Sequence, residues 1–193
     1  MPQARRDPQP PRPGRPNHGP RAAAGNRRAL LAAATQVFAE QGFDAPLSSV
    51  ARRAGVGQGS LYRHFPDRVS LALAVFEENV AALEALAARP GTTFERLLAT
   101  VTEQTIDSVV FVDLLVAEDR DPRLDAVTER VRTVVAASLK QARASGTVRR
   151  SLRTDEVMVA ITMVAAFVAK TPADERRAAS DAAWRLLRRA LRP

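Results

Sequence analysis

The stretch RRAGVGQGSLYRHF, Arg52 to Phe65, decides the fold of this 193-residue chain. Three of the chain's nine glycines, Gly55, Gly57 and Gly59, lie within five of its residues. Apolar residues at helical spacing lie on both sides of the glycines, so the pattern predicts two helices around a short turn. Two short helices joined by a turn that contains glycine form a helix-turn-helix.

Each glycine of this stretch has a different expected role. Gly55 supplies the positive φ that the turn needs. Gly57 falls at the N-cap of the second helix, where glycine is acceptable but poorer than Ser. Gly59 lies inside that helix, where glycine costs about 0.5–1 kcal/mol relative to Ala. Because a glycine inside a pattern often marks close approach of the backbone to another surface, we expect this helix to dock on a partner.

The second helix also has two distinct faces. Leu61 and Phe65 are expected to point inward. The opposite face carries polar and aromatic side chains that can donate to phosphate oxygens and to base edges, and it has no side chain at Gly59. Its members are Gln58, Gly59, Ser60, Tyr62, Arg63 and His64. Arg68 lies in the first turn of the next helix, where a cation opposes the helix dipole unless it meets an anion such as phosphate.

The rest of the chain is helical in pattern and predicts an all-α protein of about nine helices. From Asn26 onward no window shows the sustained alternation of a strand. The expected helices cover about 26–41, 46–54, 58–64, 67–88, 92–107, 108–118, 122–146, 154–170 and 172 to the C-terminal region. Asp67 is a good N-cap. Thr92 with Glu95 and Thr171 with Asp174 have capping-box spacing.

The segment LSSVARRAGVGQGSLYRHFPDRVSLALAV, Leu47 to Val75, resembles the DNA-binding segment of the TetR family of bacterial transcriptional repressors. VFAEQGFDA, Val37 to Ala45, also resembles the end of the first helix of that family. The matching positions of the longer segment are Val50, Ala51, Ala54, Gly55, Val56, Gly59, Ser60, Leu61, Tyr62, His64, Phe65 and Arg68. The chain departs from the family at Gly57 and Pro46, where Ser or Thr is common.

The resemblance implies roles for the outward residues. Tyr62, His64 and Arg68 would contact phosphates, while Gln58, Ser60 and Arg63 would lie at or near base edges. A side-chain amide such as that of Gln58 can pair with adenine through two hydrogen bonds. The expected DNA-binding residues are Ser48, Gly57, Gln58, Gly59, Ser60, Tyr62, Arg63, His64 and Arg68.

These observations divide the chain into three expected parts. Residues 1–25 contain seven of the thirteen prolines and almost no large apolar residue, so we expect a disordered, basic arm. Residues 26–70 would form the helix-turn-helix DNA-binding domain, and residues 71–193 a helical ligand-binding and dimerisation domain. The expected dimer-interface residues on the last two helices are Met158, Ile161, Ala165, Trp184, Leu187 and Leu191. The expected ligand-pocket residues are Phe94, Glu103, Asp107, Phe111, Asp113 and Phe167.

Other classes of protein find no support in the sequence. The chain has no Cys, which excludes disulfides and thiolate–metal sites and is typical of a reducing, cytoplasmic location. Asp119, Asp121 and Asp125 lack the Gly and Glu that an EF-hand loop needs at its sixth and twelfth positions. No motif for an enzyme, a metal or a cofactor remains. The longest apolar run, residues 157–169, is shorter than the roughly 20 residues of a membrane span.

Two functional hypotheses follow. The first is a homodimeric repressor that binds a palindromic double-stranded DNA operator and is released by a small-molecule effector. The alternative is a non-specific nucleic-acid or membrane-surface protein. It would act through the basic arm, since residues 1–28 hold seven Arg and one Asp, and through the C-terminal face of Arg185, Arg188, Arg189 and Arg192.

Overall fold

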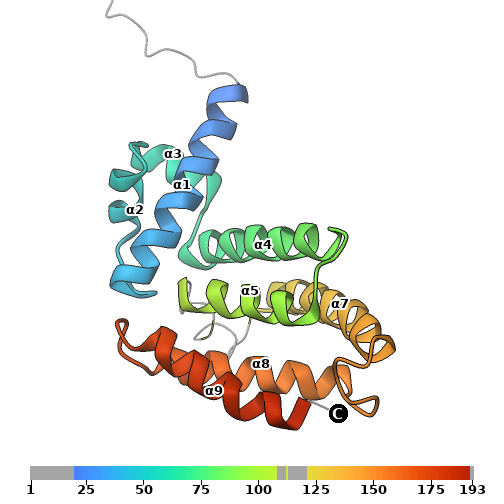
Figure 1. The fold of residues 1–193 in the computed structure, drawn as a ribbon. Coiled ribbons are helices and arrows are strands. Elements are labelled where there is room, and N and C mark those ends of the chain that lie inside the picture. The colour runs from blue at the N-terminus through green and yellow to red at the C-terminus, as the bar shows by residue number, and fades with distance from the viewer. Residues whose placement is uncertain (1–19, 108–111, 113–120, 192–193) are drawn as a thin grey trace, which may run out of the picture.

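The computed structural model describes residues 20–107, 112 and 121–191, and these residues form eight α-helices and no strand (Figure 1). The helices are α1 (Pro20–Gln41), α2 (Leu47–Arg53), α3 (Gln58–His64), α4 (Arg68–Ala87), α5 (Phe94–Asp107), α7 (Arg123–Ala144), α8 (Thr154–Ala169) and α9 (Arg176–Leu191). The all-α prediction is therefore confirmed. The helix expected over residues 108–118 lies outside the described residues.

A first hydrophobic cluster joins α1, α2, α3 and the beginning of α4. Its fully buried side chains include Val37 of α1, Val50 of α2 and Leu71 of α4. Leu61 and Phe65 are 1% and 3% exposed in the same cluster, so both point inward as predicted. The short helices α2 and α3 are thus held by core contacts, because helices of seven residues are marginal in isolation.

A second hydrophobic cluster lies among the end of α4 and the helices α5, α7, α8 and α9. In Figure 1, α8 and α9 lie side by side below α5, and α4 lies above it. Leu83 of α4 belongs to the second cluster, whereas Leu71, Ala72, Ala74 and Val75 belong to the first. The domain boundary expected between residues 70 and 71 therefore falls inside α4, and this one helix connects the two cores.

Two helices begin at residues that differ from the expected ones. The first starts at Pro20 and not near Asn26, because Ala22, Ala23 and Ala24 are strong helix formers that extend α1 toward the N-terminus. The last starts at Arg176 and not at the Thr171–Asp174 capping box. There the Glu175 N–H donates to the Pro172 carbonyl at 3.0 Å and closes a turn before the helix begins.

Side chains cap the N-termini of α4 and α5. Asp67 caps α4, as predicted, and its carboxylate accepts from the Ser70 N–H at 2.6 Å. Thr93 caps α5, where its hydroxyl accepts from the Arg96 N–H at 3.1 Å. The expected cap, Thr92, instead donates its hydroxyl to the Leu86 carbonyl at 2.8 Å.

Candidate functional site

The turn between α2 and α3 has the expected glycine geometry. Gly55 has a φ of +65°, in the left-handed region that favours glycine. The Val56 N–H donates to the Ala51 carbonyl at 3.0 Å, and the Val56 side chain packs against the first cluster. Gly57 is the N-cap of α3 and makes no side-chain capping bond. The first turn of α3 therefore keeps backbone N–H groups without a side-chain cap.

The outward face of α3 is open to solvent. Gln58, Gly59, Tyr62 and Arg63 are exposed, and the Tyr62 ring is 52% exposed. Large aromatic rings are usually covered in a folded monomer, so an exposed tyrosine among polar groups is typical of a contact surface. Among the described residues, nothing hydrogen-bonds to the Tyr62 hydroxyl or to the Gln58 amide, which leaves both available to a partner.

Gly59 is not required by the packing of the protein itself. A Cβ atom built at Gly59 meets no atom within 4 Å, and its φ is not positive. The only side-chain contact to its backbone is from Arg63, whose Nε donates to the Gly59 carbonyl at 3.0 Å among the described residues. The backbone of α3 therefore faces open space here, as expected for a helix that docks closely on another molecule.

Two arginines near this face already have acidic partners. Arg68 lies 3.0 Å from the Asp44 carboxylate and 5.4 Å above the Phe43 ring. Arg53 holds both oxygens of Glu40 at 2.7 Å, and this hydrogen bonding lowers the pKa of the Glu40 carboxyl. Because Asp44 is almost fully exposed, phosphate can compete with it for Arg68.

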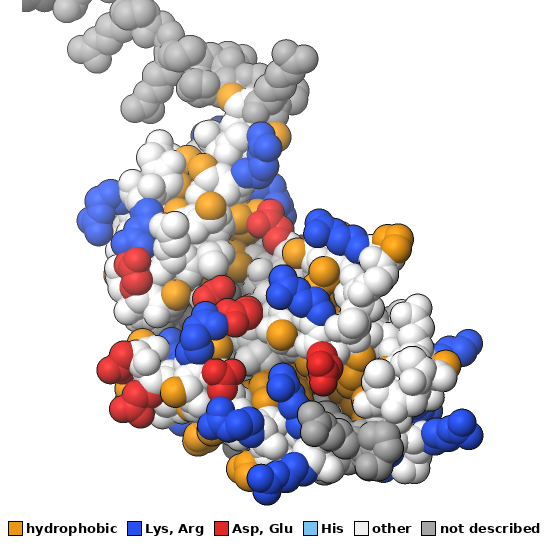
Figure 2. Space-filling model, in the orientation of Figure 1, with side chains coloured by type: hydrophobic (Ala, Val, Ile, Leu, Met, Phe, Trp, Pro, Cys, Tyr) orange, Lys and Arg blue, Asp and Glu red, His pale blue; other side chains and the backbone are white. Residues whose placement is uncertain are grey.

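Arg27 is a basic residue beside α3 that is not among those expected from the sequence. Its guanidinium lies 5.3 Å from the centre of the Phe65 ring, directly after the C-terminal end of α3. The signal in the sequence was its spacing three residues before the buried Leu30, which places it on the side of α1 that faces the helix-turn-helix. In Figure 2, basic side chains lie on the part of the molecule that α1, α2 and α3 form.

The remaining expected DNA-binding residues lie around the same helices. Ser48 is exposed in the first turn of α2. Ser60 and His64 are half-buried on α3, and the His64 ring lies 6.2 Å from that of Phe65. The structure therefore brings the set together at one end of the molecule, with α3 presenting most of it.

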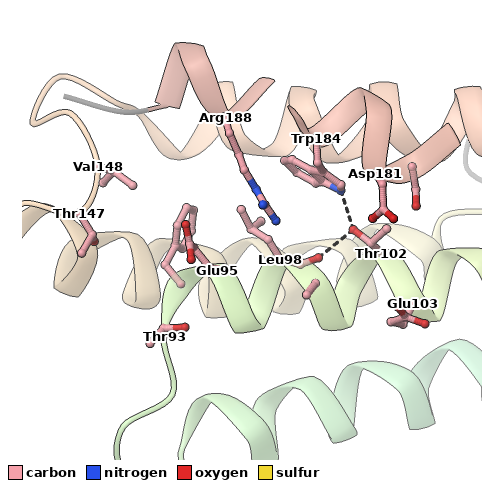
Figure 3. Close-up of a pocket in the computed structure, with 13 residues that line it drawn as sticks. Thr93, Glu95, Leu98, Thr102, Glu103, Thr147, Val148, Asp181, Trp184 and Arg188 are labelled. Carbon is pink, nitrogen blue, oxygen red and sulfur yellow. Dashed lines mark hydrogen bonds between the residues drawn. The ribbon is translucent and has the colours of Figure 1, made fainter. Parts of the chain in front are cut away.

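A cavity of about 400 Å³ lies between α5, α9 and the segment around Val148 (Figure 3). Two of the expected pocket residues, Phe94 and Glu103, line it. Neither Asp107 nor Phe167 lines this cavity, and Phe167 is 53% exposed on α8. Phe111 and Asp113 lie outside the described residues.

Trp184 points into this cavity and not toward a second copy of the chain. Its side chain is 6% exposed, and its indole N–H donates to the Thr102 hydroxyl at 2.7 Å. That hydroxyl donates to the Leu98 carbonyl at 2.9 Å (Figure 3). Trp184 is consequently not available for the dimer interface predicted from the sequence, because its apolar surface is buried within the protomer.

The other described residues expected at the dimer interface are also buried or half-buried within the protomer. Ala165 is buried, and Met158, Ile161 and Leu187 are half-buried against the second cluster. Leu191 ends α9, and its side chain is not among those described. The exposed apolar residues of these helices are instead Val159, Met163 and Phe167 of α8 and Leu186 of α9, each more than half exposed. We call these four residues the outer apolar stripe.

Two further properties concern the described part of the chain. No helix in it is long and apolar enough to cross a membrane. Within the same residues, no group of three or more His, Asp or Glu is arranged to hold a metal ion.

Known proteins resemble both parts of this molecule. The sequence profile of bacterial regulatory proteins of the tetR family matches residues 30–75. The transcriptional activator FasR of Mycolicibacterium smegmatis is 39% identical over 72 residues, which are 31% of this chain and 33% of FasR. The transcriptional regulator CymR of Pseudomonas putida is 33% identical over 120 residues, which are 55% of this chain and 59% of CymR. The matches thus span a third to three fifths of these curated relatives.

A solved structure extends the likeness over most of the fold. The TetR transcriptional regulator SCO0520 from Streptomyces coelicolor is 29% identical, with a TM-score of 0.59. The match covers 86% of this chain and 98% of that one, and therefore includes the helices beyond the helix-turn-helix. With the turn at Gly55 and the open face of α3, these likenesses identify the chain as a member of the TetR family of DNA-binding transcriptional regulators.

Proposed function

We propose that this regulator is a repressor that binds a palindromic operator as a homodimer and is released by a small-molecule effector. The observation that carries the proposal is the outward face of α3, with its exposed Tyr62, its polar groups without partners and its open backbone at Gly59. A helix of this kind enters the major groove with its polar side chains toward base edges and phosphates.

The homodimer is supported by the outer apolar stripe on α8 and α9. Val159, Met163 and Phe167 recur at every fourth residue, so they form one continuous line along α8. A second copy would cover this line and bring two α3 helices into one particle. Two recognition helices one DNA turn apart, about 34–36 Å, match two half-sites of a palindrome.

Release by an effector requires a connection between the two cores, and α4 supplies it. The first turn of α4 is tied to the start of α7, because the Arg123 guanidinium donates to the Ser70 hydroxyl at 3.3 Å and binds the Asp121 carboxylate at 2.6 Å. The helix α5 lines the cavity and also packs against α4 and α1. A ligand that displaces α5 would therefore move α4 and change the separation of the recognition helices.

The test is a gel shift with the DNA upstream of the protein's own gene. The double variant Tyr62→Ala, His64→Ala should lose specific binding while its circular dichroism spectrum stays that of the wild type, since Tyr62 is exposed and His64 half-buried. Arg89→Ala, which removes an exposed cation from the end of α4, is the matched control and should bind normally. Equal binding by the double variant would show that α3 is not the recognition helix.

Two additional measurements address the remaining parts of the proposal. Excess unrelated DNA should fail to compete for the shifted complex, whereas a non-specific basic protein would be displaced. Deletion of the gene should raise transcription from the bound promoter if the protein represses. A fall in transcription would instead indicate an activator, like FasR.

A further inference from the structure

The cavity between α5 and α9 has apolar walls and three charged groups that no salt bridge holds among the described residues. The walls include Phe94, Leu98 and Trp184, which are at most 6% exposed. Its volume of about 400 Å³ falls within the range of small-molecule pockets, roughly 300–1,000 Å³. The polar groups of the floor are already bonded, since Thr102 joins the Trp184 indole to the Leu98 carbonyl. The charges at the margins therefore decide which ligand fits.

Charged side chains of both signs line the cavity. Glu103 is satisfied by both guanidinium nitrogens of Arg177, at 2.5 and 2.8 Å. In contrast, no salt bridge within the described part of the chain holds Arg188, Asp181 or Glu95, and Asp181 adds only a weaker electrostatic attraction to Arg177. Figure 3 shows Arg188 and Asp181 reaching from α9 toward α5 on opposite sides of Trp184, with Glu95 nearer to Arg188. Arg188 follows Asp181 by seven residues, which is about 10 Å along a helix.

From this arrangement we propose that the cavity binds a zwitterion with an apolar middle and charged ends about 10 Å apart. Its anionic end would pair with Arg188, its cationic end with Asp181, and its hydrocarbon or aromatic middle would lie on Trp184 and Leu98. A simple anion would leave Asp181 unpaired beside it, and a simple cation would meet Arg188. A ligand with both charges is complementary to both ends.

The two carboxylates outside salt bridges have opposite effects in this proposal. Asp181 binds the ligand's cation, so its loss weakens binding. Glu95 lies near Arg188 and competes with the ligand's anion for the guanidinium, so its loss strengthens binding. A purely cationic ligand would lose affinity when either carboxylate is neutralised. The signs of these two substitutions therefore separate the ligand classes.

A second copy of the chain on the outer apolar stripe would leave the cavity open. Leu186 lies two residues from both Trp184 and Arg188, which places it about 200° around α9 from either side chain. Leu186 is 69% exposed, whereas Trp184 is buried against α5. The stripe and the cavity thus lie on opposite sides of α9.

Trp184 is the only tryptophan of the chain, so intrinsic fluorescence reports directly on the cavity. The probes are 8-aminooctanoate, whose extended chain suits the charge separation, and its single-charge analogues octanoate and octylamine. We expect 8-aminooctanoate to change the Trp184 emission saturably, with roughly tenfold tighter binding than either analogue, because each analogue lacks one charge-assisted contact.

The variants are chosen so that each has a matched control. Arg188→Gln and Asp181→Asn should each weaken 8-aminooctanoate binding roughly tenfold, and Glu95→Gln should strengthen it. Arg185→Gln and Asp174→Asn remove exposed charges of the same signs outside the cavity and should leave binding unchanged. All five side chains are exposed, so the thermal midpoints should stay near that of the wild type, which circular dichroism checks.

Three results would overturn the proposal. Equal binding of octylamine, with weakening by both carboxylate variants, would show a cation site. Equal binding of octanoate would show an anion site. The absence of any saturable emission change with 8-aminooctanoate would show that the cavity does not accept this class of ligand.

The idea that this ligand is the effector rests on the proposed function, whereas the binding experiment does not. The fluorescence titration needs no DNA, so it judges the cavity even if the operator gel shift fails. Conversely, if the protein binds its operator but 8-aminooctanoate does not change its emission, the proposed function stands and the proposed ligand class is rejected. If 8-aminooctanoate releases operator DNA from the wild type but not from Arg188→Gln, ligand binding in the cavity controls DNA binding.

Discussion

The backbone of α3 is uncovered at Gly59, and this single residue gives a direct test of close docking. In the free protein a Cβ atom there would meet open space, so the structure gives no internal reason for glycine. Glycine in a helix is less stable than alanine because it loses more conformational freedom on folding. Replacing Gly59 with alanine should therefore stabilise the free protein and weaken its binding to DNA.

We expect Gly59→Ala to raise the free energy of unfolding by up to about 1 kcal/mol, measured by urea denaturation. The same variant should bind operator DNA more weakly in a gel shift, since the added methyl group occupies the space of the docked groove. Gly25→Ala is the matched control, because Gly25 is also helical with nothing within 4 Å of an added Cβ. It should gain stability and bind normally. Unchanged DNA affinity of Gly59→Ala would disprove close approach at this position.

The residue roles in the helix-turn-helix were largely predictable because they depend on local geometry. The positive φ of Gly55 and the inward side chains of Leu61 and Phe65 follow from spacing along the chain. The pairing of Arg68 with Asp44 was not predictable, since its partner lies 24 residues away and depends on how α4 meets the loop after α1. For the same reason the contact of Arg27 with Phe65 was missed.

At the scale of elements, α4 carries the connection between the two cores, and its N-terminus belongs to the first of them. Asp67 accepts the Ser70 N–H, and this hydrogen bond is the main cause that lowers the pKa of the Asp67 carboxyl. Arg123, the first residue of α7, donates to the Ser70 hydroxyl in the same turn. Loosening this turn should therefore affect the whole fold and not only one helix end.

Asp67→Ala should lower the free energy of unfolding by about 1 kcal/mol, the usual loss for an N-cap acid. Asp67→Asn retains an acceptor oxygen and should remain close to the wild type. Chemical denaturation followed by circular dichroism measures both. If the alanine variant were as stable as the asparagine variant, the cap would contribute nothing and the connection through α4 would rest on core packing alone.

For the helices of the second core, the sequence did not predict which side of each helix faces the core. The sequence of α8 is apolar on nearly all sides, so its periodicity could not tell which side faces α5 and which faces outward. Of the expected interface residues of α8, Ala165 is buried and Met158 is half-buried, whereas Val159, Met163 and Phe167 are exposed. Trp184 was misplaced because its hydrogen bond to Thr102 depends on how α9 lies across α5.

At the scale of the whole molecule, paired carboxylates determine how stability varies with pH. Among the residues that the structure describes, arginine partners or backbone N–H groups at helix N-termini lower the pKa of seven carboxyls: Glu40, Asp67, Glu84, Glu103, Asp121, Asp155 and Glu156. The pKa of Asp121 falls from 3.8 to about 2, mainly through its hydrogen bond to the Arg123 side chain. A depressed carboxyl stabilises the fold above its unfolded pKa and loses that contribution as the pH falls through the folded pKa.

The thermal midpoint should therefore be nearly constant between about pH 5 and 8 and fall steadily as the pH drops toward 2. Asp121→Asn should flatten the part of this fall between 3.8 and about 2, the window set by its two pKa values. Differential scanning calorimetry over this range measures both curves. A variant curve that runs parallel to the wild type throughout this window would contradict the role of the Asp121–Arg123 pair.

The proposed homodimer can be tested at the outer apolar stripe. Met163 lies in the middle of the outer apolar stripe and is 58% exposed, so a charge there would be buried if a partner covers the stripe. Met163→Arg should give a monomer by light scattering, because an unpaired buried charge is strongly unfavourable in an interface. Ala137→Arg, on the exposed side of α7, adds the same charge elsewhere and should stay dimeric.

The Met163→Arg monomer should bind a full palindrome no better than a half-site, since one α3 helix reads only one half-site. A Met163→Arg protein that remained dimeric would place the interface elsewhere on the molecule.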